Sequence, residues 1–330
     1  MPESVAAVVV TFNRAQLLLE CLAALIAQTR AVDCIVLIDN ASTDGTPAVL
    51  RQHGYLDHPF IDYTRLPSNT GGAGGFHEGV KRAMELGADW IWIMDDDAEP
   101  YADALELMGG AFERKGIAAV ANLPVGANGE LQIEHRGWLR VCGLSTRPFR
   151  AIGATRQEAE FDISFCSFVG LAIRRQAVER IGLPKRELFI KGDDLEYCVR
   201  LAAVGPIRLV PGSKIRHKDE AGTHAESKTR LGMRSQRVPL ERLWASYFSL
   251  RNLLWLRLQH CGLVIGGLYS LLQLGRRALG IMLFDSQRLV RLRFYFSAVI
   301  DAWRGIFDND KPRRLARAPS RKVPSCGPAT

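Results

Sequence analysis

Apolar, β-prone runs alternate with helical segments between residues 5 and 100, and a polar cluster follows each run. The runs are 5–11, 35–38, 60–65 and 90–94, and apolar residues at helical spacing separate them. This alternation predicts an α/β fold with a mostly parallel sheet and helices on both faces. Ligands of such sheets bind beyond the carboxyl ends of the strands. We therefore expect the polar clusters to meet at one cleft; they are 11–14, 39–42, 69–75 and 95–97.

Length and composition set the broad class of the protein. The 330 residues are 47% hydrophobic, which excludes a disordered chain and predicts one large domain with an appendage. Seven scattered cysteines without a CxxC pair predict buried, reduced thiols, with neither a zinc site nor a disulfide framework. The chain opens almost at once with a core strand and shows no signal-peptide pattern, so we expect a cytoplasmic protein.

Positive charge is concentrated towards the end of the chain. From residue 231 onward 17 Lys and Arg stand against 5 Asp and Glu, whereas the first 230 residues carry 26 against 30. The basic part favours an anionic membrane surface, with nucleic acid or a simple solvated face as alternatives. Residues 261–275 are apolar but too short to span a bilayer. Helices in 239–307 are therefore predicted to lie on a membrane, to form a homo-oligomer interface or to be an ordinary subdomain.

Three aspartates in a row, Asp95, Asp96 and Asp97, directly follow the apolar run 90–94. Neighbouring carboxylates raise the cost of ionising one another, and a hard divalent cation removes that cost. Alternate residues of an extended chain project the same way, so Asp95 and Asp97 are predicted to share an ion while Asp96 points elsewhere. The alternative is a cap for the helix expected to begin near Tyr101.

The clusters after the other runs have the chemistry of nucleotide recognition. Asp39 is suited to accept a hydrogen bond from a uracil imide or a ribose hydroxyl, although turns commonly hold an aspartate. Thr11 and Arg14 are placed to touch base and phosphate. The glycine-rich segment from Asn69, which includes Gly74, lets backbone amides approach a phosphate or sugar closely. It has neither the lysine of a P-loop nor the setting of a dinucleotide fingerprint.

A second acidic group stands at the start of a predicted helix and contains Asp193, Asp194 and Glu196. A sugar hydroxyl that attacks an anomeric carbon needs a base to take its proton, and a single carboxylate is suited to inversion. Helix capping is the alternative for one of the two aspartates. His217, at the end of a possible last strand 214–217, is either an extra metal ligand or a structural histidine. Residues 126–165 give no prediction.

Five segments in this order resemble the family-2 glycosyltransferases of GT-A fold. They are VVVTFNR (8–14), VLIDNASTDGT (36–46), NTGGAGGF (69–76), WIWIMDDD (90–97) and FIKGDDLEYCVRL (189–201). The resemblance covers roughly residues 5 to 220. Within the family, the glycine-rich, DDD and GDD segments look most like bacterial galactofuranosyltransferases of the galactan-initiating type.

The resemblance implies roles for individual residues. By position, Asp95, Asp97 and His217 match metal ligands that hold Mn²⁺ or Mg²⁺ against the donor diphosphate. Asp194 matches the catalytic base. The remaining expected contacts divide between nucleoside or donor (Thr11, Arg14, Asp39, Asn69, Gly74, Asp96) and acceptor (Asp193, Glu196), with Trp138 as a possible acceptor-stacking aromatic.

These expectations combine into one predicted function. An inverting, metal-dependent transferase moves galactofuranose from UDP-galactofuranose to a rhamnosyl-terminated polyprenyl-diphosphate lipid, at the inner face of the plasma membrane and without a nucleic-acid partner. The predicted divisions are a GT-A domain (1–230), a helical region (231–310) and a disordered basic tail (311–330). Gly192 departs from polymerising relatives, which carry tryptophan there, and Arg251-Asn252 resembles rhamnosyltransferases. A dTDP-sugar rhamnosyltransferase and a non-catalytic nucleotide-sugar-binding scaffold are therefore the alternatives.

Overall fold

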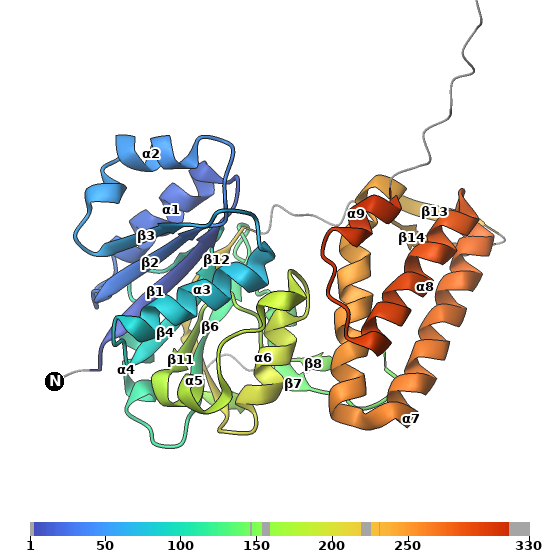
Figure 1. Ribbon diagram of the computed structural model, residues 1–330. Coiled ribbons are helices and arrows are strands. Elements are labelled where there is room, and N and C mark those ends of the chain that lie inside the picture. Colours follow the sequence, from blue (N-terminus) through green and yellow to red (C-terminus); the bar gives the residue numbers. More distant parts are fainter. Residues whose placement is uncertain (1–2, 146, 154–158, 219–225, 231, 317–330) are drawn as a thin grey trace, which may run out of the picture.

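The protein consists of a sheet lobe followed by a helical lobe (Figure 1). The computed structural model describes residues 3–316 except 146, 154–158, 219–225 and 231. The predicted alternation of the first hundred residues is confirmed. Its elements are β1 (Val5–Thr11), α1 (Ala15–Ile26), β2 (Cys34–Asp39), α2 (Thr46–Gln52), β3 (Ile61–Arg65), α3 (Gly71–Glu85) and β4 (Trp90–Asp95).

One nine-stranded sheet forms the centre of the first lobe, with strand order β3-β2-β1-β4-β11-β6-β12-β5 and β9 beside β12. The later strands are β5 (Ala98–Pro100), β6 (Ala119–Val125), β9 (Phe161–Ile163), β11 (Leu171–Arg174) and β12 (Ile207–His217). From β3 to β4 every pair is parallel, as predicted. Beyond β4 the sheet is mixed, because β11 runs antiparallel to both β4 and β6. The expected α/β fold is confirmed, and β6 and β12 form a further parallel pair beyond β11.

Alternate residues of the central strands bury their side chains on opposite faces of the sheet. Val8 and Val10 of β1 pack with Phe76 of α3, on the face that α5 (Arg175–Ile181) and α6 (Asp193–Leu201) also cover. Val9 packs on the other face with Leu22 of α1 and with α4 (Ala104–Phe112). Helices on both faces, the predicted arrangement, therefore bury both sides of the strands.

Residues 126–165, where no element was predicted, supply short strands. In this region β7 (Arg136–Leu139), β8 (Phe149–Ala151) and β10 (Phe165–Cys166) form a separate sheet of order β10-β7-β8. The fully buried Arg136 donates to the carbonyl oxygens of Asn122 and Val169 at 2.7 and 2.5 Å and so joins this sheet to the large one. Strands of two to four residues are too short to show a periodic pattern.

The helical lobe contains α7 (Trp244–Phe284), α8 (Arg288–Arg304) and α9 (Lys311–Ala316). Helix α7 is interrupted at Gly262, where the chain reverses, and α8 lies beside the two segments and antiparallel to the second (Figure 1). The hairpin of β13 (Glu226–Arg230) and β14 (Met233–Arg237) joins this lobe, where Arg237 pairs with Asp285. The predicted disordered tail is wrong over α9, and its remainder lies outside the described residues. Among the described residues, no helix combines the length and apolarity that crossing a membrane requires.

A disulfide between Cys142 and Cys261 connects the loop after β7 to the kink of α7. The prediction of reduced thiols is wrong for this pair. It is confirmed for the four free cysteines among the described residues, which are Cys21, Cys34, Cys166 and Cys198. The two bridged cysteines are 119 positions apart, so no local spacing pattern marks them.

Candidate active site

The predicted convergence of polar clusters at the strand ends is confirmed. Thr11 and Asp39 are register partners at the ends of β1 and β2, and Val10 pairs with Asp95 at the end of β4. Asn40 links the glycine-rich segment to this edge: its Oδ1 accepts from the Thr70 backbone N–H at 2.9 Å, and its Nδ2 donates to the carbonyl of residue 71 at the same distance.

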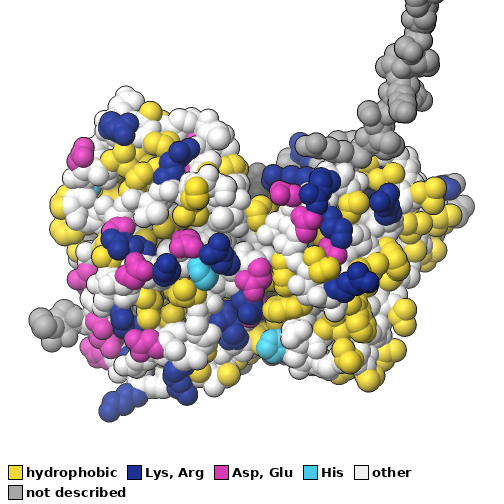
Figure 2. Space-filling view, in the orientation of Figure 1, with side chains coloured by type: hydrophobic (Ala, Val, Ile, Leu, Met, Phe, Trp, Pro, Cys, Tyr) yellow, Lys and Arg dark blue, Asp and Glu magenta, His cyan; other side chains and the backbone are white. Residues whose placement is uncertain are grey.

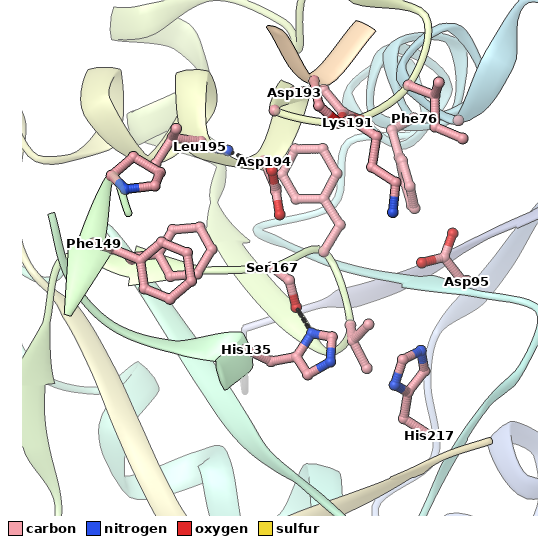
Figure 3. Close-up of a pocket in the computed structure, with 18 of the residues that line it drawn as sticks. Phe76, Asp95, His135, Phe149, Ser167, Lys191, Asp193, Asp194, Leu195 and His217 are labelled. Atoms are coloured by element: carbon pink, nitrogen blue, oxygen red, sulfur yellow. Dashed lines mark hydrogen bonds between the residues drawn. The ribbon is translucent and has the colours of Figure 1, made fainter. Parts of the chain in front are cut away.

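A cavity of about 550 Å³ opens at this edge of the sheet. Acidic side chains from β4 and from the start of α6 face it from two sides (Figure 3). Lining side chains that the sequence predicted are Arg14, Asp95, Asp97, Asp193, Asp194 and His217. The structure thus brings both predicted acidic groups to one pocket.

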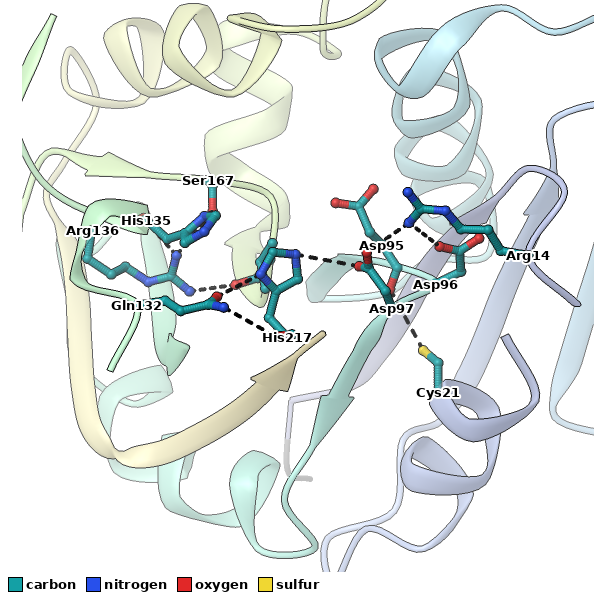
Figure 4. Close-up of polar contacts among 11 residues, drawn as sticks. Arg14, Cys21, Asp95, Asp96, Asp97, Gln132, His135, Arg136, Ser167 and His217 are labelled. Atoms are coloured by element: carbon teal, nitrogen blue, oxygen red, sulfur yellow. Dashed lines mark hydrogen bonds and ion pairs between the residues drawn. The ribbon is translucent and has the colours of Figure 1, made fainter. Parts of the chain in front are cut away.

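The three consecutive aspartates have different surroundings (Figure 4). Asp95 lines the cavity. Asp96 is buried and turned away, as predicted, and accepts hydrogen bonds from Thr11 Oγ1 at 2.7 Å and Arg14 Nη1 at 3.3 Å. Arg14 also pairs with Asp97 Oδ2 at 2.8 Å. Arg14 is therefore the cationic partner of the acidic cluster.

Burial and the neighbouring negative charges disfavour the charged forms of Asp95 and Asp96. Burial, followed by the charges of Asp97 and Asp96, raises the pKa of Asp95 well above its ordinary value. Burial raises the pKa of Asp96 to about 6, against the lowering effect of Thr11 and Arg14. A cluster with raised pKa values in a pocket is the electrostatic setting in which a bound cation is favourable.

His217 reaches Asp97 because β12 and β5 are antiparallel and His217 pairs with Ala98. Its Nδ1 lies 2.7 Å from Gln132 Oε1, an acceptor, so Nδ1 donates to it, and Nε2 of the neutral ring offers its lone pair to a metal. That Nε2 is 3.6 Å from Asp97 Oδ1, a buried oxygen without a hydrogen-bond partner. A free imidazole nitrogen and an unsatisfied carboxylate oxygen beside Asp95 are donors that fit Mn²⁺ or Mg²⁺. Within the described residues, no three such side chains already form a closed ligand cluster.

The second acidic pair stands at the N-terminus of α6, where the helix dipole favours negative charge. Asp194 Oδ1 accepts a hydrogen bond from the Leu195 backbone N–H at 2.7 Å. Burial raises the pKa of both aspartates, and for Asp193 the charge of Asp194 adds to this and brings it to about 7. Lys191, whose charge opposes both shifts, also lines the cavity. The arrangement provides a carboxylate that accepts a proton near neutral pH.

One wall of the cavity is apolar and was not predicted. Phe149 of β8 and Phe165 of β10 stack with ring centroids 3.8 Å apart, and Leu253 of α7 lies on the same wall. Two polar residues were missed as well: His135 accompanies His217, with ring centroids 5.0 Å apart, and shares a 2.9 Å hydrogen bond with Ser167 Oγ. All except Leu253 come from the part of the sequence between 126 and 170, where periodicity gave little signal.

Several residues that were predicted to contact the substrates do not line the cavity, because their side chains bond to other protein groups. The carboxylate of Glu196, which is buried, pairs with Arg200 at 2.7 Å, so the expected acceptor contact is wrong in this structure. The fully buried Asp39 accepts from the Ser42 N–H and the Tyr63 hydroxyl, and thereby shapes the turn after β2. Trp138 donates to the Asp162 carbonyl and lies outside the cavity wall.

The glycine-rich segment is tightly packed against protein. A Cβ on Gly74 would stand 2.3 Å from Thr70 Oγ1, and one on Gly71 would stand 2.1 Å from the carbonyl oxygen of Phe189. The Asn69 side chain accepts from the N–H of residue 71 at 2.8 Å. The close approach of neighbouring protein atoms therefore explains why residues 71 and 74 are glycine. Gly72 is the glycine of this segment that lines the cavity.

The sheet and its acidic edge define a glycosyltransferase of GT-A fold, and solved structures of that class superpose on the chain. GalNAc-T7 with UDP, GalNAc and Mn²⁺ aligns with a TM-score of 0.57 at 16% identity, over 77% of this chain and 48% of that one. Residues 1–349 of S. aureus TarS align with a TM-score of 0.55 at 13% identity, over 95% and 90%.

Residues 6–182 match the model of glycosyl transferase family 2, and the chain belongs to that family. It is 32% identical to galactofuranosyltransferase GlfT1 of Mycolicibacterium smegmatis over 210 residues, 62% of this chain and 67% of the relative. The Mycobacterium tuberculosis protein of the same name is 34% identical over 62% and 66%. The dTDP-rhamnosyl transferase RfbF of Shigella flexneri is 22% identical over 93% of this chain and 97% of its own. The protein is thus an enzyme, and the non-catalytic scaffold is set aside.

Proposed function

We propose that the protein transfers galactofuranose, with inversion, from UDP-galactofuranose to a rhamnosyl-terminated polyprenyl-diphosphate lipid. The observation that carries the proposal is the pairing of a donor-side acidic edge with a second carboxylate pair across one cavity. Similarity to proteins named galactofuranosyltransferase supports the sugar, and the apolar wall around Phe149 and Leu253 supports a lipid-linked acceptor.

The chain's residues divide the reaction between them. Asp194 takes the proton of the attacking acceptor hydroxyl as the new bond forms to the anomeric carbon and the bond to the diphosphate oxygen breaks. Asp193 and Lys191, beside it on the cavity wall, orient the acceptor and set the charge around the base. Arg14 holds Asp96 and Asp97 in place, which keeps Asp97 directed at the cavity.

Asp95, Asp97 and His217 are the residues that would hold Mn²⁺ or Mg²⁺. When bound there, the ion neutralises the charge that develops on the departing UDP. Gln132 fixes the His217 ring so that Nε2 faces the site, the usual arrangement behind a metal-binding histidine. Thr11, Asp39 and Asn69 remain proposed as the nucleoside side of the site, through the turns that their hydrogen bonds shape.

The test is a product assay with UDP-galactofuranose and a synthetic rhamnosyl lipid, with and without EDTA. We expect one new galactofuranosyl linkage of inverted configuration, lost with the chelator and restored by Mn²⁺. Absence of product from this pair, with turnover of another nucleotide sugar, contradicts the proposed donor.

A rhamnosyltransferase that uses a dTDP-sugar is the second candidate. The similarity to RfbF extends over 93% of the chain and so includes the helical lobe, whereas the galactofuranosyltransferase matches cover 62%. Assaying dTDP-rhamnose in parallel with UDP-galactofuranose separates the candidates, because turnover is expected with one of the two donors.

The helical lobe supports the proposed association with the inner face of the plasma membrane. Exposed apolar side chains run along α7 and α8, among them Leu271, Leu289 and Phe296, and Figure 2 shows apolar and basic side chains over this lobe together with a few acidic ones. Between residues 242 and 307 the sequence has two acids, Asp285 and Asp301, and both are buried in ion pairs. The exposed faces of α7 and α8 are therefore apolar and cationic, with the acids Asp308 and Asp310 lying beyond α8. Such faces complement anionic lipid and disfavour pairing with a second identical face. Sedimentation with anionic and neutral vesicles tests this, and a salt-independent dimer without vesicle binding contradicts it.

A further inference from the structure

The loop that precedes the catalytic pair has an unfavourable backbone conformation. Phe189 and Lys191 both have φ of 66°, and Gly192 has φ of 90°. Left-handed backbone is costly for residues with a side chain, and such a conformation persists only where surrounding contacts impose it. Since Asp193 follows directly, this loop sets the direction in which Asp193 and Asp194 enter the cavity.

The contacts that impose this conformation come from the helical lobe. Asn252 of α7 is buried, and its Nδ2 lies 3.0, 3.1 and 2.7 Å from the carbonyl oxygens of Leu188, Ile190 and Lys191. Two amide hydrogens thus serve three carbonyls that turn towards one point. A residue that only filled space at this position would take this donor away from the carbonyls of Ile190 and Lys191, whereas the Leu188 carbonyl also accepts from the Ile190 N–H at 2.8 Å.

Arg251 fixes the orientation of that amide. Its Nε donates to Asn252 Oδ1 at 2.9 Å, which leaves Nδ2 facing the loop, and its Nη2 donates to the Leu188 carbonyl at 3.3 Å. The guanidinium is fully buried and lies over the rings of Phe248 and Phe307, 5.0 and 4.8 Å from their centroids. Two aromatic rings therefore hold Arg251 in addition to its hydrogen bonds.

The sheet lobe holds the loop from its other side. The N–H of Ala73 in the first turn of α3 donates to the Phe189 carbonyl at 3.0 Å. Ser249 and Leu253, one turn or less from Asn252 on α7, line the cavity. The catalytic pair is consequently positioned at a junction of α3 and α7, and the helical lobe is part of the active site.

We propose that Asn252, oriented by Arg251, is a positioning residue that holds Leu188–Gly192 in the conformation that directs Asp193 and Asp194 into the cavity. The inference rests on the proposed role of Asp194 as the base, and it holds for whichever sugar is transferred. It assigns to the Arg-Asn pair of α7 a part in the chemical step.

The test compares Asn252→Asp with Asn252→Ala. The Asp side chain has nearly the same shape as Asn but no N–H, and its charge repels the three carbonyl oxygens. Ala removes the amide altogether. We therefore expect each variant to lower kcat about 100-fold. KM for the donor and UDP affinity are expected to stay within about twofold, because the donor edge is untouched. Asn252→Gln, which keeps the donors, is expected to recover part of kcat.

Tyr247→Phe is the matched control on the same helix. It removes a buried 2.6 Å hydrogen bond to Asp301 and leaves the loop contacts in place. We expect a lower melting temperature with kcat within about twofold of wild type. Loss of kcat in this control equal to that of Asn252→Asp means that general loosening of α7 is responsible, and overturns the proposal.

Hydrogen exchange gives a readout that needs no substrate. Peptides covering 186–196 should exchange faster in Asn252→Asp than in wild type, while those from β1 and β4 should not change. Asp194→Asn separates the proposed base role of Asp194 from the proposed positioning role of Asn252. If the Asp194→Asn enzyme stays active, the assignment of the base fails. If Asp194→Asn is inactive while Asn252→Asp keeps wild-type kcat and exchange, the positioning role alone is refuted.

Discussion

The two sides of the cavity are built in different ways. The acidic side, formed by Arg14, Asp95, Asp97 and His217, lies at the ends of strands in the large sheet. The apolar side comes from the small sheet and from α7, with Phe149, Phe165 and Leu253 as its main residues. The first side follows from the sheet's strand order, and the second from contacts between segments far apart in the chain. We expect the acidic side to be common to family members and the apolar side to vary with the acceptor.

Asp194, between the two sides, should give the largest effect. Asp194→Asn keeps the size of the side chain and removes the base, so we expect kcat to fall about 10³-fold with UDP affinity unchanged. Steady-state kinetics together with calorimetric UDP titration measure both quantities. Robust turnover by this variant sinks the assignment of the base.

The acidic side is tested next by Asp97→Asn. Removing one ligand charge should weaken Mn²⁺-dependent UDP binding about 100-fold while leaving metal-free binding nearly the same. Asp103→Asn is the control, because Asp103 is exposed at the start of α4 and its side chain makes no capping bond. Equal loss in both variants points to a general charge effect and against a metal site.

The pH dependence of kcat tests the carboxyl pair of Asp193 and Asp194, which lies between the two sides of the cavity. Because burial raises the pKa of Asp193 to about 7 and that of Asp194 in the same direction, the pair holds protons to higher pH than an exposed carboxyl. Because the base acts in its deprotonated form and burial raises the pKa of Asp194, kcat should fall as the pH is lowered from 8 to 6. The charge of Lys191 opposes the rise in the pKa of both aspartates. A flat kcat over this range contradicts the prediction.

The apolar side should give the smallest effect. Phe149→Ala removes half of the stacked pair and about 1 kcal/mol of contact with an acceptor, which raises acceptor KM about fivefold. Donor KM should stay the same. Leu107→Ala, at an exposed apolar residue of α4 away from the cavity, is the matched control. A change in donor KM would show that the two sides are not separable.

The sequence predicted the acidic side well and the apolar side not at all. Strand periodicity placed Thr11, Asp39 and Asp95 at one edge, because parallel neighbours end together. It failed for Phe149 and Phe165, whose strands have three and two residues. The predicted acceptor contact of Glu196 failed for another reason: Arg200 pairs with this carboxylate, and sequence spacing does not reveal which partner a side chain will find. For Gly74, the structure shows that a Cβ would meet Thr70, and its predicted contact with the donor stays a prediction.

The contact between Gly71 and Phe189 constrains how this enzyme can diverge. No side chain fits at residue 71 while the carbonyl of residue 189 stays where it is, since a Cβ would stand 2.1 Å from it. A lineage that gains a larger residue at 71 must therefore reshape the segment before the aspartate pair, or lose activity. The two segments are expected to be inherited as one unit, with paired substitutions across related sequences and few chimeras that exchange only one of them.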